Sequence, residues 1–158
     1  MKLDDLKKIS KEIRREVLTI IYESKSGHLG CSLGIVDILL TLYFNTLNIN
    51  PKDPLLKTRD RFLLSKGHAC SALYAILAKR GFFPKSLLKT YFMNGSRLAG
   101  HVTLGSVPGI EATFGSLGHG LSIGIGMSLA LKQQNLLSKV YVLIGDGECA
   151  EGSIWEGM

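Results

Sequence analysis

The chain has 158 residues, 46% of them hydrophobic, so it is long and apolar enough to form one substantial core. It carries 19 lysines and arginines against 13 acidic residues, a formal net charge of +6. In the first segment basic and acidic residues alternate, as on a solvated helix face, and no block of like charges with interleaved aromatics occurs. We therefore expect no nucleic-acid binding, whereas phosphorylated small molecules remain compatible with the basic balance.

The start of the chain and its cysteines indicate a compartment. MKLDDLKKIS lacks the apolar region of a signal peptide, and no run approaches about 18 uninterrupted apolar residues. We expect a cytoplasmic protein that does not bind a membrane. Cys31, Cys70 and Cys149 are widely spaced and form no Cys-x-x-Cys pair, so the sequence suggests neither a zinc site nor disulfides, only small buried or half-buried thiols.

Two helices are predicted in the first third of the chain. From Leu3 to Tyr22 apolar residues recur at steps of three and four, which predicts an amphipathic helix that ends before Gly27. Residues 35–47 are apolar on nearly all sides and predict a helix packed on several faces. Residues 48–60, with two prolines and an Asn cluster, then predict a loop.

The middle of the chain is predicted to hold a strand, helices and a long loop. Residues 61–65 are a short apolar run typical of a buried strand, and 68–81 have helical spacing with Gly81 as the C-terminal cap. Pro84 suits the first turn of a further short helix. Residues 94–113 are rich in glycine and turn residues, and a loop of this length in a compact domain is usually functional.

The last third predicts a glycine-rich helix and the clearest strand. Residues 116–133 show helical periodicity despite four glycines, which indicates that another backbone packs closely there. The β-prone run 139–147 leads into a glycine turn. Alternating helices and short strands predict an α/β protein with a largely parallel sheet flanked by helices.

The turn Gly145-Asp146-Gly147 lies where ligands bind in open parallel sheets, at the carboxyl end of a strand. Glycines there permit a positive φ and close approach of a ligand. Asp146 can supply one oxygen to Mg²⁺, which proteins usually hold together with substrate phosphates. The alternative is a tight turn in which Asp146 caps a helix.

All four histidines follow a glycine, and three of them, His28, His68 and His101, lie at or near the junction of a loop with an element. A lone histidine is more often structural than catalytic. Three imidazoles converging on one cleft, however, would suit hydrogen bonding to a polyhydroxylated, phosphorylated substrate and proton transfer near neutral pH. The fourth, His119, is expected on a helix packing surface, and the backbone of 113–118 at that helix start could hold a phosphate or a polar ring.

Five segments taken together closely resemble the transketolase family, specifically its amino-terminal, pyrophosphate-binding portion. In chain order they are KSGHLG (25–30), RDRFLLSKGH (59–68), GH (100–101), GIEATFGSLGHGLS (109–122) and GDGECAEGSIWE (145–156). The resemblance implies a thiamine diphosphate-binding fold. Residues 1–158 would be a partial pyrophosphate-binding domain, with a sheet that is incomplete at its C-terminal end.

The resemblance also implies roles for individual residues. Asp146 would bind the divalent metal, Mg²⁺ or in its place Ca²⁺ or Mn²⁺, that clamps the diphosphate of thiamine diphosphate. His28 would lie near the reacting carbons, and His101 would contact the donor sugar's hydroxyls. Glu151 is implied in catalysis, as a member with Glu156 of an acidic network at a subunit interface. The remaining cofactor contacts implied are His68, Gly115, Ser116, Leu117, Gly145 and Gly147.

The activity implied is transfer of a two-carbon ketol unit between phosphorylated sugars, as in the pentose phosphate pathway of carbohydrate metabolism. It requires a pyrimidine-binding domain or subunit, within a dimer or another homo- or hetero-oligomer. The resemblance implies that the carboxylate which activates the cofactor's pyrimidine comes from that other domain, so the isolated chain is expected to be inactive. No asparagine, the family's second metal ligand, occurs after Gly147.

Two further departures from the family pattern leave details open. His119 replaces a more usual glutamine, and the short segment 101–109 leaves substrate preference undecided. One alternative is a deoxyxylulose-phosphate synthase, although the segment RDRFLLSKGH favours transketolase. The other is a non-catalytic remnant or interaction protein that keeps the fold without the cofactor.

Overall fold

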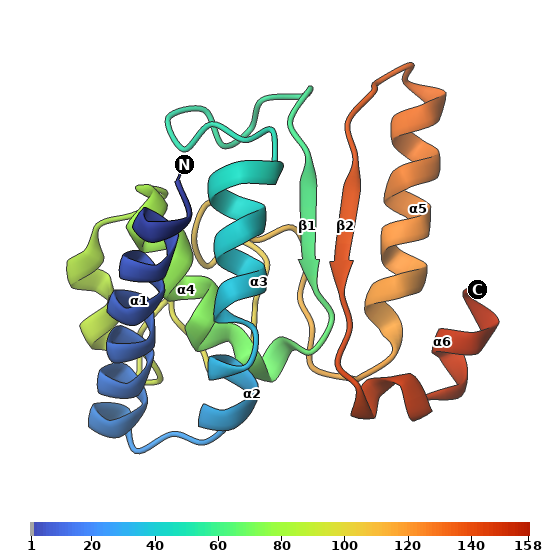
Figure 1. Ribbon diagram of the computed structural model, residues 1–158. Coiled ribbons are helices and arrows are strands. Elements are labelled where there is room, and N and C mark those ends of the chain that lie inside the picture. The colour runs from blue at the N-terminus through green and yellow to red at the C-terminus, as the bar shows by residue number, and fades with distance from the viewer. Residues whose placement is uncertain (1) are drawn as a thin grey trace.

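The centre of the protein is a parallel sheet, seen in a computed structural model that describes residues 2–158. The sheet described consists of β1 (Arg61–Leu64) and β2 (Val140–Leu143), paired in register from Arg61 with Val140 to Leu64 with Leu143. The helices α1, α3 and α4 lie on the β1 side, and α5 lies beside β2 (Figure 1). The predicted α/β class and the parallel sheet flanked by helices are thereby confirmed.

The first helix, α1 (Leu3–Ser24), forms where the apolar periodicity predicts it and ends at Lys25, which has a left-handed backbone. A stripe of buried residues, Ile13, Val17, Ile20 and Ile21, faces the core. Its helical spacing of three and four explains why this face packs and the charged face remains in solvent.

The next apolar stretch is helical but not continuous. It consists of α2 (Leu29–Leu33), α3 (Val36–Thr41) and the π-helical turn η1 (Leu42–Thr46). The prediction for 35–47 is therefore confirmed in type, while α2 was missed because five residues are too few to show a helical period. The break falls at Ile35, where φ is −105° and ψ is 0°.

The span Leu29–Thr46 has a mean hydropathy of 1.5, and by length and composition alone it could cross a membrane. A core helix passes the same test. Within this span Val36, Leu39, Leu40 and Tyr43 are buried in the hydrophobic core.

The central helix is α4 (Cys70–Arg80), preceded by the 3₁₀ turn η2 (Gly67–Ala69). Every residue from Cys70 to Ala78 is buried, so this helix is packed on all sides. Gly81 is left-handed with φ 89° and confirms the predicted cap. The short 3₁₀ helix η3 (Lys85–Thr90) begins one residue after Pro84, so the proline precedes its first turn. No helix or strand is assigned between Tyr91 and Gly118, which confirms the long loop.

The glycine-rich helix α5 (His119–Gln133) begins three residues later than predicted, because Gly118 before it adopts a left-handed φ of 84°. Close approach explains Gly120 and Gly124, but not Gly126, where a Cβ would meet no atom within 4 Å. A Cβ on Gly124 would lie 2.5 Å from Cγ2 of Val142 in β2, and a Cβ on Gly120 would overlap Ser65 after β1. The chain then forms the 3₁₀ turn η4 (Gly147–Ala150) and the short helix α6 (Gly152–Glu156).

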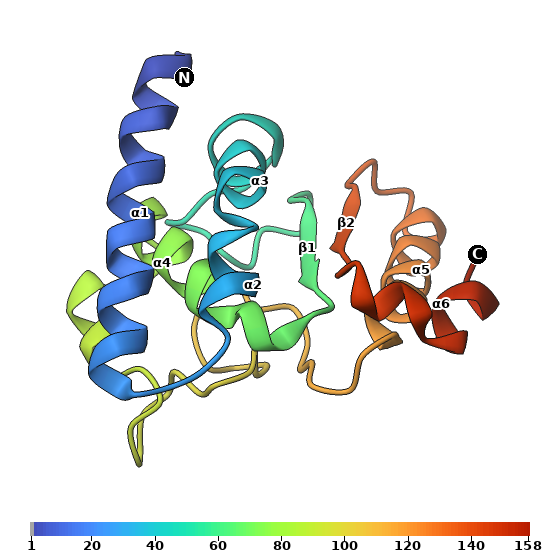
Figure 2. The same ribbon diagram turned by 60° about the horizontal axis from the view of Figure 1, so that its bottom comes forward.

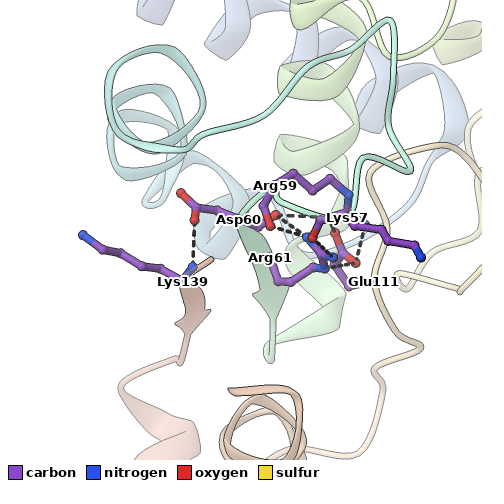
Figure 3. A network of polar contacts seen from close by, with 6 residues as sticks. All are labelled: Lys57, Arg59, Asp60, Arg61, Glu111 and Lys139. Carbon is purple, nitrogen blue, oxygen red and sulfur yellow. Dashed lines mark hydrogen bonds and ion pairs between the residues drawn. The ribbon is translucent and has the colours of Figure 1, made fainter. Parts of the chain in front are cut away.

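A polar network fixes the amino ends of both strands (Figure 3). Asp60 accepts hydrogen bonds from the backbone N–H groups of Asn48 and Lys139, both at 2.8 Å. Beside it Arg59 forms a two-armed ion pair with Glu111, with Nη2 2.9 Å from Oε2 and both side chains mostly buried. The charged residues of the motifs RDR (59–61) and GIE (109–111) therefore stabilise the amino-terminal end of the sheet. The histidines lie at the opposite, carboxyl-terminal end.

Candidate functional site

The carboxyl ends of β1 and β2 meet at one edge of the sheet, and the loops that follow them lie together there. Figure 2 turns this end of the sheet toward the viewer. Ser65, directly after β1, donates its backbone N–H to the carbonyl of Leu143 at 3.0 Å. The long loop between η3 and α5 also lies at this edge. The N–H of Val102 donates to the carbonyl of Gly67 at 3.4 Å, and the N–H of Phe114 donates to the carbonyl of Val102 at 3.1 Å. This is the location at which open parallel sheets bind ligands.

Three of the four histidines come together at this edge. The ring centroids of His28 and His68 are 4.9 Å apart, and those of His28 and His101 are 6.3 Å apart. His28 has a left-handed backbone with φ 67° at the start of α2, and the carbonyl of His101 accepts a hydrogen bond from the hydroxyl of Tyr74 at 3.3 Å. The convergence inferred from three Gly-His pairs is observed, while the chemical role of each ring remains a prediction.

His119 lies apart from this cluster. It is exposed at the first position of α5, and its Nδ1 lies 3.0 Å from the carbonyl oxygen of Leu117. The expectation that it faces a helix packing surface is not met within the described chain, because no other element covers it.

The segment Gly115, Ser116 and Leu117 borders the histidine cluster. A Cβ on Gly115 would lie 3.9 Å from Cδ2 of His101. Gly115 and Ser116 are exposed and Leu117 is half-buried. The segment therefore lies beside the site, while its contact with the cofactor remains a prediction.

Asp146 presents its carboxylate to solvent at the end of β2. It precedes η4 but forms no side-chain capping hydrogen bond, so the alternative in which Asp146 acts as a helix cap is not supported. A Cβ on Gly147 would meet no atom within 4 Å, which leaves open space beside the carboxylate. The positive φ that glycines permit is not adopted at this corner, since neither Gly145 nor Gly147 is left-handed. The chain turns through the 3₁₀ geometry of η4 instead.

Glu148, which the sequence reasoning missed, is the buried carboxylate of the site and only 2% exposed. Its Oε1 accepts hydrogen bonds from the Ser65 hydroxyl and, at 2.8 Å, from Gly118 N–H. Its Oε2 accepts Gly145 N–H at 3.0 Å. Ser65 Oγ also accepts Gly120 N–H at 3.0 Å. One carboxylate thus joins the loop after β1, the loop after β2 and the start of α5.

A sequence signal for Glu148 does exist. A glutamate three residues after the start of a helical turn commonly reaches back to the first N–H groups of that turn. Glu148 stands three positions after Gly145, whose N–H it accepts. Its other two donors, on Ser65 and Gly118, come from distant segments. The spacing alone would therefore predict the hydrogen bond to Gly145 but not the burial of the Glu148 side chain.

Glu151 and Glu156 are both exposed in this chain. Glu151 precedes α6, and its Cβ would lie 2.9 Å from a Cβ on Gly118.

Cys149 is exposed as well, so the expectation of buried or half-buried thiols is wrong for that residue, whereas Cys70 is buried and Cys31 half-buried. The surface formed by η4 and α6 is therefore open.

Burial lowers the pKa of His68 below its usual value of 6.5, and the neighbouring His28, Lys66 and His101 lower it further. The imidazole of His68 is therefore neutral at pH 7. We expect its ring protons to titrate, by NMR, with a midpoint below 6.5, and His28→Ala to move that midpoint upward because a neighbour that lowers the pKa of His68 is removed. Because the pKa of His68 is lower in the folded chain than in the unfolded chain, protonation favours the unfolded chain. The contribution of His68 to stability therefore falls as the pH decreases from 6.5 toward the pKa of the folded state. An unchanged midpoint in His28→Ala would contradict this coupling.

The geometry can be compared with known proteins. Residues 6–158 match the sequence profile described as transketolase, thiamine diphosphate binding domain. The chain belongs to the transketolase family. A transketolase of Campylobacter jejuni has the same fold, with a TM-score of 0.93 and 32% identity over 99% of this chain and 26% of that one. The transketolase resemblance and the thiamine diphosphate-binding fold are confirmed.

Two curated relatives within the transketolase family are also matched over part of their length. One subunit of the apulose-4-phosphate transketolase of Phocaeicola vulgatus is 44% identical over 156 residues, which cover 99% of this chain and 55% of that protein. A 6-deoxy-6-sulfo-D-fructose transketolase subunit of Clostridium sp. strain MSTE9 is 44% identical over 152 residues, 96% of this chain and 55% of that protein. The chain therefore spans about half the length of these two relatives.

Proposed function

We propose that this chain binds the diphosphate of thiamine diphosphate through a divalent metal at Asp146 and, with a pyrimidine-binding domain or subunit, transfers a two-carbon ketol unit between phosphorylated sugars. The observation that carries the proposal is the exposed, uncapped carboxylate of Asp146 beside the open space at Gly147, at the same sheet edge as three histidines. In a transketolase-family domain this combination provides both a cofactor anchor and a polar substrate surface.

The residues present fit a metal and a diphosphate. Asp146 offers one hard oxygen ligand, and Mg²⁺ typically takes one or two carboxylates together with phosphate oxygens. The neighbouring Glu148 cannot be a second ligand without breaking its contacts, because both of its oxygens accept buried hydrogen bonds. When bound, thiamine diphosphate would supply an electron sink for the carbon–carbon bond cleavage, while the protein binds and orients it.

The histidines suit the sugar. His28 and His101 are exposed imidazoles that can each donate or accept a hydrogen bond with a hydroxyl group. His68, half-buried and neutral at pH 7, can accept or donate through one nitrogen without a net charge. The three rings would hold the hydroxyls of the substrate and move protons between them near neutral pH.

The need for a partner is supported by an exposed apolar surface on α5 and α6. Leu129 is 56% exposed and Ile125, four residues before it on the same face of α5, is 38% exposed, while Trp155 in α6 is 66% exposed. Apolar side chains gathered in this way usually mark an interaction site. The exposed acids Glu151 and Glu156 lie on the same part of the chain, where a partner could bury them.

The sugar is proposed only by class. The names of the two relatives described above specify different sugars, an apulose phosphate and a sulfofructose, at the same 44% identity. A further alternative, a deoxyxylulose-phosphate synthase, has no support from these relatives. The proposal also includes a role in the pentose phosphate pathway and a cytoplasmic location.

The proposal is tested by calorimetry with thiamine diphosphate and Mg²⁺, on the chain alone and mixed with a candidate pyrimidine-binding subunit, followed by an assay of ketol transfer. We expect binding and turnover when the partner is present. Absence of binding in both conditions would refute the catalytic proposal and favour a non-catalytic interaction protein.

A further inference from the structure

Three side chains with nitrogen or sulfur ligand atoms lie together at the start of α2 and in η2. One ring nitrogen of His28, one of His68 and the Sγ of Cys31 are all within 4.8 Å of one another. His28 directly precedes α2 and Cys31 is the third residue of that helix, with its Sγ 2.9 Å from the carbonyl oxygen of His28. His68 is brought to them from the loop after β1, with its ring centroid 4.9 Å from that of His28.

We propose that His28, Cys31 and His68 form a binding site for Zn²⁺ with one coordination position left open. Imidazole nitrogen and thiolate sulfur are ligands that zinc prefers, and three protein ligands with an open fourth position are typical of zinc sites that hold a water or a small ligand. Mg²⁺ prefers oxygen ligands. The proposed site is therefore chemically different from the carboxylate of Asp146.

The distances allow metal binding with small movements. Zinc–sulfur bonds of about 2.3 Å and zinc–nitrogen bonds of about 2.0–2.1 Å place tetrahedral ligand atoms roughly 3.3–3.8 Å apart. The three atoms need to approach by about 1 Å, which side-chain rotation can supply because His28 is exposed and the other two are half-buried. Within residues 2–158 this is the one group of three histidine, cysteine or acidic side chains that meets this distance criterion.

The other two thiols are not equivalent to Cys31. Cys70 is buried, and burial raises the pKa of its thiol to about 11, so it is unsuited to act as a thiolate ligand. Cys149 is exposed and, like Cys31 toward His28, its Sγ donates to a backbone carbonyl, that of Gly145 at 3.4 Å, but it is not a member of the group formed by His28, Cys31 and His68. Cys149 therefore provides a matched control.

The two histidines also carry the proposed sugar contacts. If the proposed function holds, zinc at this site and a sugar at the same rings exclude each other, so occupancy would inhibit the enzyme. Zinc binding itself does not rest on the proposed function, since it needs neither thiamine diphosphate nor a partner.

The test is a titration of the untagged, reduced and metal-free chain with Co²⁺, which reports ligand type by its absorption. We expect the near-ultraviolet thiolate-to-cobalt band together with the intense visible bands of four-coordinate cobalt, and their loss when Zn²⁺ is added. Excess Mg²⁺ should leave both bands unchanged. A spectrum without the thiolate band, or displacement of cobalt by Mg²⁺, would overturn the proposal.

Variants assign the ligands. Cys31→Ser should abolish the thiolate band, whereas Cys149→Ser should retain it. His68→Gln should weaken Zn²⁺ binding at least about tenfold, since loss of even an outer-shell partner of a bound metal costs about 10- to 100-fold. Circular dichroism of each variant establishes that it is folded, and His28→Gln replaces His68→Gln if the latter is not. Retention of the band in Cys31→Ser, or its loss in Cys149→Ser, would refute the assignment.

Discussion

Replacing Asp146 with alanine should weaken Mg²⁺-dependent binding of thiamine diphosphate by at least about 10- to 100-fold, the loss that follows removal of even an outer-shell partner of a metal. The carboxylate is exposed and makes no capping hydrogen bond, so its removal takes away the proposed metal ligand and no side-chain hydrogen bond within the chain. The free energy of unfolding should therefore change by less than about 0.5 kcal/mol. Calorimetry with the assembled protein measures the affinity, and urea unfolding measures the stability.

The matched control is Asp53→Ala, which removes the same charge from an exposed position in the loop before β1. Its affinity for the cofactor should equal that of the unaltered chain. Equal affinities in Asp146→Ala and Asp53→Ala would contradict the assignment of Asp146 as the metal ligand, whereas a large loss of stability in Asp146→Ala would indicate a structural role.

Replacing Glu148 with alanine should lower the free energy of unfolding by about 3 kcal/mol or more, because three buried donors each lose their acceptor at a cost of about 1–3 kcal/mol. The donors are the Ser65 hydroxyl and the N–H groups of Gly118 and Gly145. The free energy of unfolding of Glu148→Gln should lie between those of the unaltered chain and Glu148→Ala. The amide keeps one acceptor oxygen, but its NH₂ group faces a remaining donor. Urea unfolding of both variants measures the series.

The control for Glu148 is Glu151→Ala, which removes an exposed acid three residues away and should change the stability by less than about 0.5 kcal/mol. Glu148 also fixes both loops of the site, so Glu148→Gln should weaken thiamine diphosphate binding even at temperatures where the variant is fully folded. A Glu148→Ala variant as stable as the Glu151→Ala variant would contradict the role assigned to the buried carboxylate.

The parallel sheet and the site edge were predictable because their signals are local. Apolar runs ending at Gly145 and near Gly67 mark two strand ends, and in a parallel sheet these ends must lie side by side. The Gly-His pairs at His28, His68 and His101 were predicted at the junctions of loops with elements, and His28 directly precedes α2 while His68 lies in η2 before α4. The burial of Glu148 was not predictable, because its hydrogen-bond donors come from segments far apart in the sequence.

The grouping of Cys31 with two histidines was missed for a similar reason. Cysteine spacing along the chain indicated no metal site, since that interpretation needs a second cysteine nearby in the sequence. The two other ligands are supplied by His28, within the same short helix region, and by His68, nearly forty residues later in the chain. Only the packing of α2 against η2 brings them together.

The pairing of β1 with β2 joins residues about eighty positions apart, from Arg61 with Val140 onward. Closing so long a segment carries an entropy cost that local helices such as α1 and α4 do not have, so these helices can form before the strands meet. Glu148 and Asp146, which follow β2, come to the sheet edge that carries the histidines only once β2 has paired with β1. A ligand that contacts both loops therefore binds the docked state alone, and its binding free energy stabilises the last long-range step of folding.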